Sequence, residues 1–202
     1  NRRKYVQCYL YDQEGVTMKR IFVASIVIVA SVAVGLPADE VEVTFNRDYV
    51  RRLIEEIYNA DSVVHVIMFS AGYYPQYPRG LNDSLYDALA YINRQGVEVK
   101  LILDQSDWNP SVTRKNVQVA KHLHELGITE VYFDPPDVTT HCKVVIIDGK
   151  MVFVGSHNWT YYALQRNNEA TVMIVSREVA TMFEQYFDQL LRVSTKTLPT
   201  VR

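Results

Sequence analysis

Segments in which apolar residues have the spacing of a β-strand alternate along the chain with segments in which they have the spacing of an α-helix. Short runs rich in β-branched residues predict strands at 41–45, 63–69, 97–103, 129–133, 141–148, 151–154 and 169–175. Apolar residues three and four positions apart predict helices at 46–60, 82–96, 111–126 and 177–192. Helices that alternate with buried strands, followed by a hairpin, predict an α/β fold, namely an α/β/α sandwich with a mixed central β-sheet.

A separate apolar segment precedes this pattern. Ile21 to Gly35 carries no charge and directly follows Met18-Lys19-Arg20. A short basic flank, an apolar run and small residues beyond it are typical of a secretory signal peptide, which we place at 18–38. A retained membrane anchor through residues 21–36 and a buried strand are the alternatives. Residues 1–17 would then be an upstream extension, 39–202 the folded domain, and the protein exported or anchored to a membrane.

Composition narrows the possible classes of protein. The 202 residues include 48% apolar and 22% charged residues, which suits one globular domain with an ordinary core. The formal net charge is −2, and residues 1–35 hold five of the basic and two of the acidic residues. A binding site for a polyanion must therefore be local. Two cysteines exclude a disulfide framework and a thiolate zinc cluster.

The candidate chemistry is concentrated near the predicted hairpin. His141 and Lys143 are two residues apart on a strand, so their side chains share a face. Ser156 and Asn158 are likewise two apart at the end of the next strand, and Glu169 opens a later one. An imidazole beside an ammonium, with hydroxyl and amide donors nearby, suits a phosphate-like anion.

The combined spacing resembles a known signature. His-x-Lys-x4-Asp at 141–148, Gly-Ser-x-Asn at 155–158 and the later Glu169 resemble the motif of the phospholipase D superfamily. The single copy resembles its small bacterial endonuclease branch and the mitochondrial single-motif members. This resemblance implies catalysis through a phosphohistidine, with no metal and no cofactor. His141 would be nucleophile or acid/base, and Lys143 and Asn158 would hold phosphate oxygens. Ser156 would lie beside them, and Glu169 would orient His141.

Two further expectations concern Asp148 and the number of histidines. Asp148 is seven residues from His141, so on a regular strand it faces the other way and is structural, at the hairpin corner. The chemistry of the family needs two histidines, and the chain has one motif. The other histidines, His65, His122, His124 and His157, lack its partners. We therefore expect a homodimer in which both His141 side chains meet at the twofold axis.

Three loops are candidates for shaping specificity, at 71–80, 104–110 and 133–140. Their aromatic and basic residues could stack on single-stranded bases and bind phosphate. The same residues could instead insert into a lipid interface, or pack within the protein with no role in substrate binding. The candidate substrate contacts, which include one residue of the motif itself, are Tyr73, Tyr74, Arg79, Trp108 and His157. His122 and His124 diverge on a helix and suit a solvated face better than a metal site.

These observations favour a metal-independent phosphodiesterase that hydrolyses nucleic acid, DNA or RNA, as an endonuclease of low sequence specificity. One alternative is a phospholipase D or phosphatidyl-transferase, because lipid head groups also present a phosphodiester. The other is a non-catalytic dimer that binds nucleic acid or lipid and keeps the fold.

Overall fold

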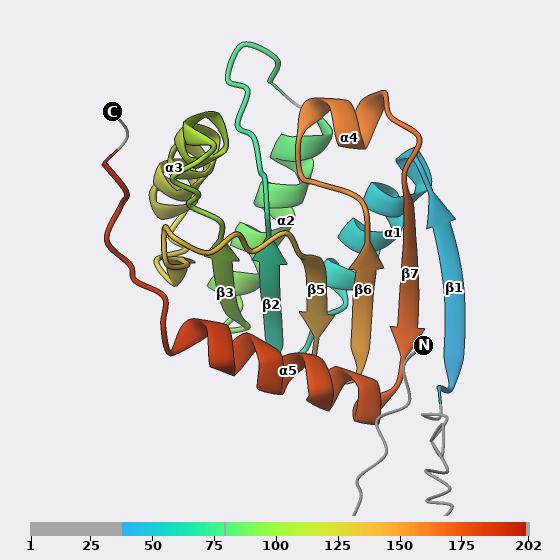
Figure 1. Ribbon diagram of the computed structural model, residues 1–202. Coiled ribbons are helices and arrows are strands. Elements are labelled where there is room, and N and C mark those ends of the chain that lie inside the picture. Colours follow the sequence, from blue (N-terminus) through green and yellow to red (C-terminus); the bar gives the residue numbers. More distant parts are fainter. Residues whose placement is uncertain (1–37, 79, 201–202) are drawn as a thin grey trace, which may run out of the picture. The chain divides into compact units, whose positions relative to one another are not determined.

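The computed structural model describes residues 38–78 and 80–200, and its central feature is one seven-stranded sheet. The predicted upstream extension and nearly all of the predicted leader, like Arg79, lie outside the described residues. The strand order is β1-β7-β6-β5-β2-β3-β4 (Figure 1). The strands are β1 (Glu40–Phe45), β2 (Val63–Met68), β3 (Glu98–Leu103), β4 (Val131–Phe133), β5 (Lys143–Ile147), β6 (Met151–Gly155) and β7 (Ala170–Val175). β2, β3 and β4 run parallel and the other pairs antiparallel, which confirms the predicted mixed sheet.

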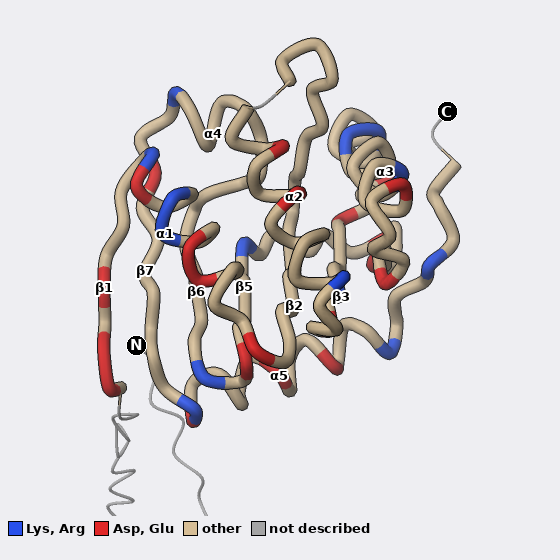
Figure 2. Tube along the Cα trace, turned by 180° about the vertical axis from the view of Figure 1, so that it is seen from behind, with Lys and Arg blue, Asp and Glu red and all other residues tan. Residues whose placement is uncertain are grey.

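Helices cover both faces of the sheet, as an α/β/α sandwich requires. They are α1 (Arg47–Tyr58), α2 (Leu81–Arg94), α3 (Pro110–Glu125), α4 (Tyr161–Gln165) and α5 (Arg177–Leu191). The larger core packs α1, α2 and α3 on one face, and the smaller core packs α5 alone on the other. Figure 1 shows α5 crossing in front of the strands, and Figure 2 shows α1 and α2 from the opposite side. No helix in the described part of the chain is long and apolar enough to cross a bilayer.

Alternation along β2 assigns its side chains to the two cores. Val64 and Val66 point to the larger core, whereas Ile67 points to α5. His65 shares the α5 face, where its ring stacks on Phe187 at 4.2 Å between centroids.

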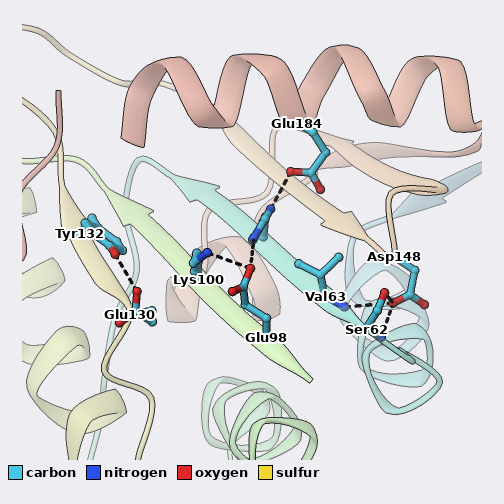
Figure 3. Close-up of polar contacts among 9 residues, drawn as sticks. Ser62, Val63, Glu98, Lys100, Glu130, Tyr132, Asp148 and Glu184 are labelled. Atoms are coloured by element: carbon cyan, nitrogen blue, oxygen red, sulfur yellow. Dashed lines mark hydrogen bonds and ion pairs between the residues drawn. The ribbon is translucent and has the colours of Figure 1, made fainter. Parts of the chain in front are cut away.

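The same histidine links α5 to the sheet through charged neighbours. Its Nδ1 lies 2.6 Å from the carboxylate of Glu184 on α5, and its Nε2 lies 3.3 Å from that of Glu98 on β3. Lys100 Nζ lies 2.8 Å from Glu98 (Figure 3). His65 is therefore committed to structure and is not available for chemistry.

Two asparagines near helix starts do not cap their helices with their side chains. The buried carboxamide of Asn82, near the start of α2, donates to the backbone carbonyls of Gly72 and Trp159. Asn46 precedes α1, but its carboxamide oxygen accepts from the Glu169 N–H at 2.9 Å. α4 was not predicted, since five residues are too few to show a helical period.

The β5–β6 hairpin places Asp148 as predicted, at its corner. Asp148 and Gly149 both have positive φ, 52° and 56°, which suits a two-residue turn between twisted strands. The Asp148 carboxylate accepts hydrogen bonds from the backbone N–H groups of Asp61, Ser62 and Val63 at 2.8–3.2 Å. Figure 3 shows the contacts with Ser62 and Val63. Burial opposes its ionisation, but these donors outweigh burial and lower the pKa of Asp148 to about 2.

Candidate active site

His141 stands where β5 begins. β5 starts at Lys143, so His141 precedes the strand instead of lying on it as predicted. The neighbouring strand supports it, because the Phe69 N–H donates to the Cys142 carbonyl at 2.9 Å. The rings of Phe69 and His141 lie 4.4 Å apart between centroids. The imidazole is thus held on one side by an aromatic ring and stays exposed to solvent on the other.

Lys143 is a buried cation beside this imidazole. Its Nζ lies 3.2 Å from each ring nitrogen of His141 and donates to the His141 backbone carbonyl at 2.9 Å. Lys143 is only 8% exposed, and no carboxylate of the described residues lies within ion-pair distance of it. A desolvated ammonium without a counter-charge is costly, so this position favours binding of an anion.

The surroundings of the pair keep the His141 ring neutral. Burial lowers the pKa of His141, the charge of Lys143 lowers it further, and the charge of Asp104 acts in the opposite direction. Burial also lowers the pKa of Lys143. A neutral imidazole has a free lone pair on one nitrogen, which is what a nucleophile needs.

The Gly-Ser-x-Asn segment brings Asn158 toward the same end of the sheet. At Gly155 an added Cβ would lie 2.4 Å from the Ala170 carbonyl oxygen, so only glycine allows β6 and β7 to approach here. The chain then crosses toward β2, where the Trp159 N–H donates to the Ser70 carbonyl at 3.0 Å. Asn158 is half-buried, and its side-chain oxygen has no hydrogen-bond partner among the described residues. Its carboxamide is therefore uncommitted and suited to a ligand.

His157 faces the opposite way and anchors this segment. The ring is fully buried, and it stacks on Tyr49 at 4.2 Å between centroids. Its Nδ1 lies 2.7 Å from the Thr171 hydroxyl and its Nε2 lies 2.9 Å from the Asn46 carbonyl oxygen. This corrects the prediction that His157 contacts substrate, because both ring nitrogens already have partners in the core.

Glu169 lies beside Ser156. Its carboxylate accepts hydrogen bonds from the Ser156 hydroxyl and from the Asn167 side-chain amide, the latter at 2.9 Å. These partners differ from the predicted one, the ring of His141. The negative charge of Glu169 nevertheless acts on Lys143, whose pKa it raises against the larger effect of burial. The orienting role of Glu169 stays a prediction.

The predicted loop contacts lie in different settings. Tyr73 stacks on His122 of α3 at 3.8 Å, and the Tyr74 hydroxyl accepts from the Tyr161 N–H at 3.1 Å. A groove of about 590 Å³ is lined by residues 72–76 on one side and by α3 on the other. Trp108 is exposed, and its indole N–H donates to the Thr139 hydroxyl at 2.6 Å. Substrate contacts by these side chains stay predictions.

Sequence reasoning missed two buried carboxylates beside the site. Asp104 and Asp134 are fully buried, and both accept from the backbone N–H of Thr140, at 2.8 and 3.2 Å. Each directly follows a predicted strand, and this position at a strand end could have indicated from the sequence that both lie near the site. The described residues contain no group of three or more His, Cys, Asp or Glu placed to hold a metal ion.

Comparison with known proteins places this architecture in a family. Residues 53–191 match the family model described as "Cardiolipin synthase, PLD-like domain". A phospholipase D of Rickettsia bellii is 38% identical over 110 residues, which cover 52% of this chain and 50% of that protein. The chain spans about half the length of the curated relatives it matches.

Solved structures share the fold. The phospholipase D family member Nuc of Salmonella typhimurium has a TM-score of 0.63 and 21% identity, covering 77% of this chain and 97% of that one. TrmBL2, an archaeal chromatin protein, has a TM-score of 0.53 and 17% identity, covering 82% and 57%. The family match extends over most of the described fold and includes the site around His141, so the chain belongs to the phospholipase D-like family.

Proposed function

We propose that this protein is a phosphodiesterase that hydrolyses nucleic acid through a phosphohistidine at His141. The observation that carries the proposal is the pairing of an exposed imidazole, whose pKa is lowered, with a buried ammonium that forms no ion pair with any carboxylate of the described residues. The ammonium attracts the phosphate, and the imidazole meets the phosphorus atom. The side-chain NH2 group of Asn158 would donate to a non-bridging oxygen, and its unpaired side-chain oxygen would remain an acceptor.

The reaction has two balanced steps. In the first, a ring nitrogen of His141 bonds to phosphorus, the bond from phosphorus to the leaving oxygen breaks, and that oxygen takes a proton from a general acid. In the second, water attacks phosphorus and gives its proton to the same group, now a base, while the nitrogen–phosphorus bond breaks. The products are a phosphomonoester and an alcohol.

A second copy of the chain would supply the general acid. His141 cannot be nucleophile and acid at once, and His65 and His157 are committed to structure. His122 on α3 stacks on the ring of Tyr73 at 3.8 Å between centroids. We propose that a homodimer brings two His141 side chains together at its twofold axis.

An uncovered apolar strip on the sheet supports this proposal. Val41, Val43 and Phe45 of β1 are 60%, 49% and 57% exposed. Val41 pairs with Ile174, which pairs with Val152 in the α5 core, so the strip shares the α5 face. It extends to Phe45 opposite Ala170, whose carbonyl accepts from the Ser156 N–H at the active-site end. A second copy could bury this strip.

Mixing wild type with His141→Ala tests the shared site. If each site needs both His141 side chains, an equal mixture refolded together retains about a quarter of the wild-type activity. Independent sites would retain about half, and that result would contradict the proposal. The activity is measured on a labelled oligonucleotide, with the dimer fraction followed by light scattering.

Nucleic acid is the substrate we favour. The fold of this chain covers 97% of the Nuc structure. TrmBL2, which shares the fold, is described by its mode of DNA binding. A phospholipid is the second candidate, because the Rickettsia relative at 38% identity is a phospholipase D. We further propose that segment 21–36 exports the chain or anchors it to a membrane.

A direct assay separates the two substrates. The protein is incubated in EDTA with single-stranded DNA, duplex DNA, RNA and phosphatidylcholine or cardiolipin vesicles. We expect nucleic acid to be cut without added metal. Cleavage of lipid alone would replace the proposal by the phospholipase alternative. Binding of either substrate without turnover, with or without divalent metal, would favour a non-catalytic binding dimer.

A further inference from the structure

Two buried carboxylates hold the segment that leads into the active site. Asp104 follows β3 and Asp134 follows β4, which are parallel neighbours, so both lie at the same end of the sheet as His141. Their oxygens share one donor, the Thr140 N–H, at 2.8 and 3.2 Å. Thr140 directly precedes His141, so this contact acts on the position of the His141 backbone.

A wider set of contacts fixes the two carboxylates. Asp104 also accepts from the Ser106 hydroxyl at 2.5 Å, and Asp134 from the Gln105 N–H at 2.7 Å. The Asn116 side-chain amide donates to the Asp104 backbone carbonyl at 2.8 Å and to the Phe69 carbonyl at 2.8 Å. The same network thus supports the ring of Phe69, against which His141 packs.

The charges near this pair are few. The charges of His141 and Lys143, near the start of β5, lower the pKa of Asp104. The charge of Asp104 raises the pKa of Asp134, and that of Asp134 raises the pKa of Tyr186 on α5. Burial raises the pKa of Asp104 and raises that of Asp134 to about 6, while the hydrogen bonds that each carboxylate accepts act in the opposite direction. The charge of Asp104 raises the pKa of His141 against burial.

We propose that Asp104 and Asp134 are positioning residues that hold the Thr140–His141 segment, and that Asp104 supplies the negative charge that favours a positively charged His141 ring. The inference rests on the proposed function, in which the ring becomes cationic when it bonds to phosphorus. Lys143 repels that positive charge, and Asp104 compensates for the repulsion. Without Asp104 the cation at Lys143 would help substrate binding but oppose the covalent step.

Asp104→Asn tests this with little change in shape. The asparagine oxygen can accept from Thr140, and its amide can donate to the Ser106 hydroxyl, so the hydrogen bonds survive while the charge is lost. Asp87→Asn is the control, because it makes the same substitution at an exposed carboxylate on α2, outside the candidate specificity loops. We expect Asp104→Asn to lower kcat about tenfold with little change in KM, and Asp87→Asn to leave both unchanged.

A readout independent of activity keeps the two proposals apart. The His141 ring is followed by NMR titration, its signals assigned by their loss in His141→Ala. In Asp104→Asn we expect His141 to titrate at lower pH than in wild type and in Asp87→Asn. An unchanged His141 titration would overturn the inference, even if kcat fell. A shifted titration in a protein without phosphodiesterase activity would sustain the electrostatic effect and overturn the proposed function.

A measurement on the wild type needs no variant. Because the Thr140 N–H is shared by two carboxylates, its chemical shift should change as the pair takes up a proton near pH 6. If the amide signal of Thr140 stayed constant between about pH 7.5 and about pH 5, the shared hydrogen bond to the two carboxylates would be contradicted.

Discussion

Substituting His141 by alanine should abolish turnover and leave the fold intact. The ring is exposed and packs only against Phe69 and the Lys143 ammonium, so little core packing is lost. Removing the atom that bonds to phosphorus should lower kcat by about four orders of magnitude or more, as for other nucleophiles that act within a catalytic set. Initial rates on a labelled oligonucleotide measure the effect.

His124→Ala is the matched control, since it removes an imidazole from α3, outside the proposed site. Thermal unfolding of both variants should resemble that of wild type. Rapid quenching with phosphorus-labelled substrate should trap a covalent adduct in wild type and His124→Ala but not in His141→Ala. Full activity of His141→Ala would refute the phosphohistidine mechanism for this chain.

Removing the charge of Asp148 should have the largest effect on stability. Its carboxylate accepts from three consecutive backbone N–H groups at the start of β2 and lies 3.2 Å from Lys150 Nζ. Asp148→Asn keeps a single acceptor oxygen, so donors are left unpaired and the free energy of unfolding should fall by about 2 kcal/mol. Urea unfolding followed by circular dichroism measures this change.

The stability that Asp148 contributes depends on pH, and its direction follows from the pKa of this carboxyl. Asp148 titrates at about 2 in the folded protein, against 3.8 for an ordinary aspartate. Its charge therefore stabilises the fold above pH 3.8, and this contribution is lost as the pH falls toward 2. The difference in unfolding free energy between wild type and Asp148→Asn should shrink over that range.

Asp61→Asn serves as the control, because that carboxylate is exposed and lies 3.9 Å from Lys150. Its unfolding free energy should stay within about 0.5 kcal/mol of wild type. The rate of folded Asp148→Asn at saturating substrate should match wild type. If it lost turnover at unchanged stability, Asp148 would have a role in chemistry that its place at the hairpin corner does not explain.

The hydrophobic periodicity of the sequence was sufficient to predict most helices and strands and the layers that they form. Runs such as 63–68 and 143–147 are mostly apolar on both faces. This pattern is typical of a central strand that is covered by helices on both sides. The motif spacing of His141, Lys143, Gly155 and Asn158 predicted the candidate site, although His141 lies just before β5 and Asn158 lies beyond β6.

Other features depended on contacts between distant segments. His157 lies inside the motif, yet its ring enters the core because Thr171 and Asn46 offer partners there. Glu169 binds Ser156, and no local pattern predicts which of several nearby groups a carboxylate selects.

The sequence by itself thus determined the α/β architecture, the motif and the structural place of Asp148, because local periodicity and turn chemistry encode them. Only the tertiary structure showed that Asp104 and Asp134 converge on Thr140. These residues lie about 30 positions apart along the chain, since a helix separates their two strands, and meet only because β3 and β4 pair in parallel. Contacts of that kind follow from strand order, which periodicity alone does not specify.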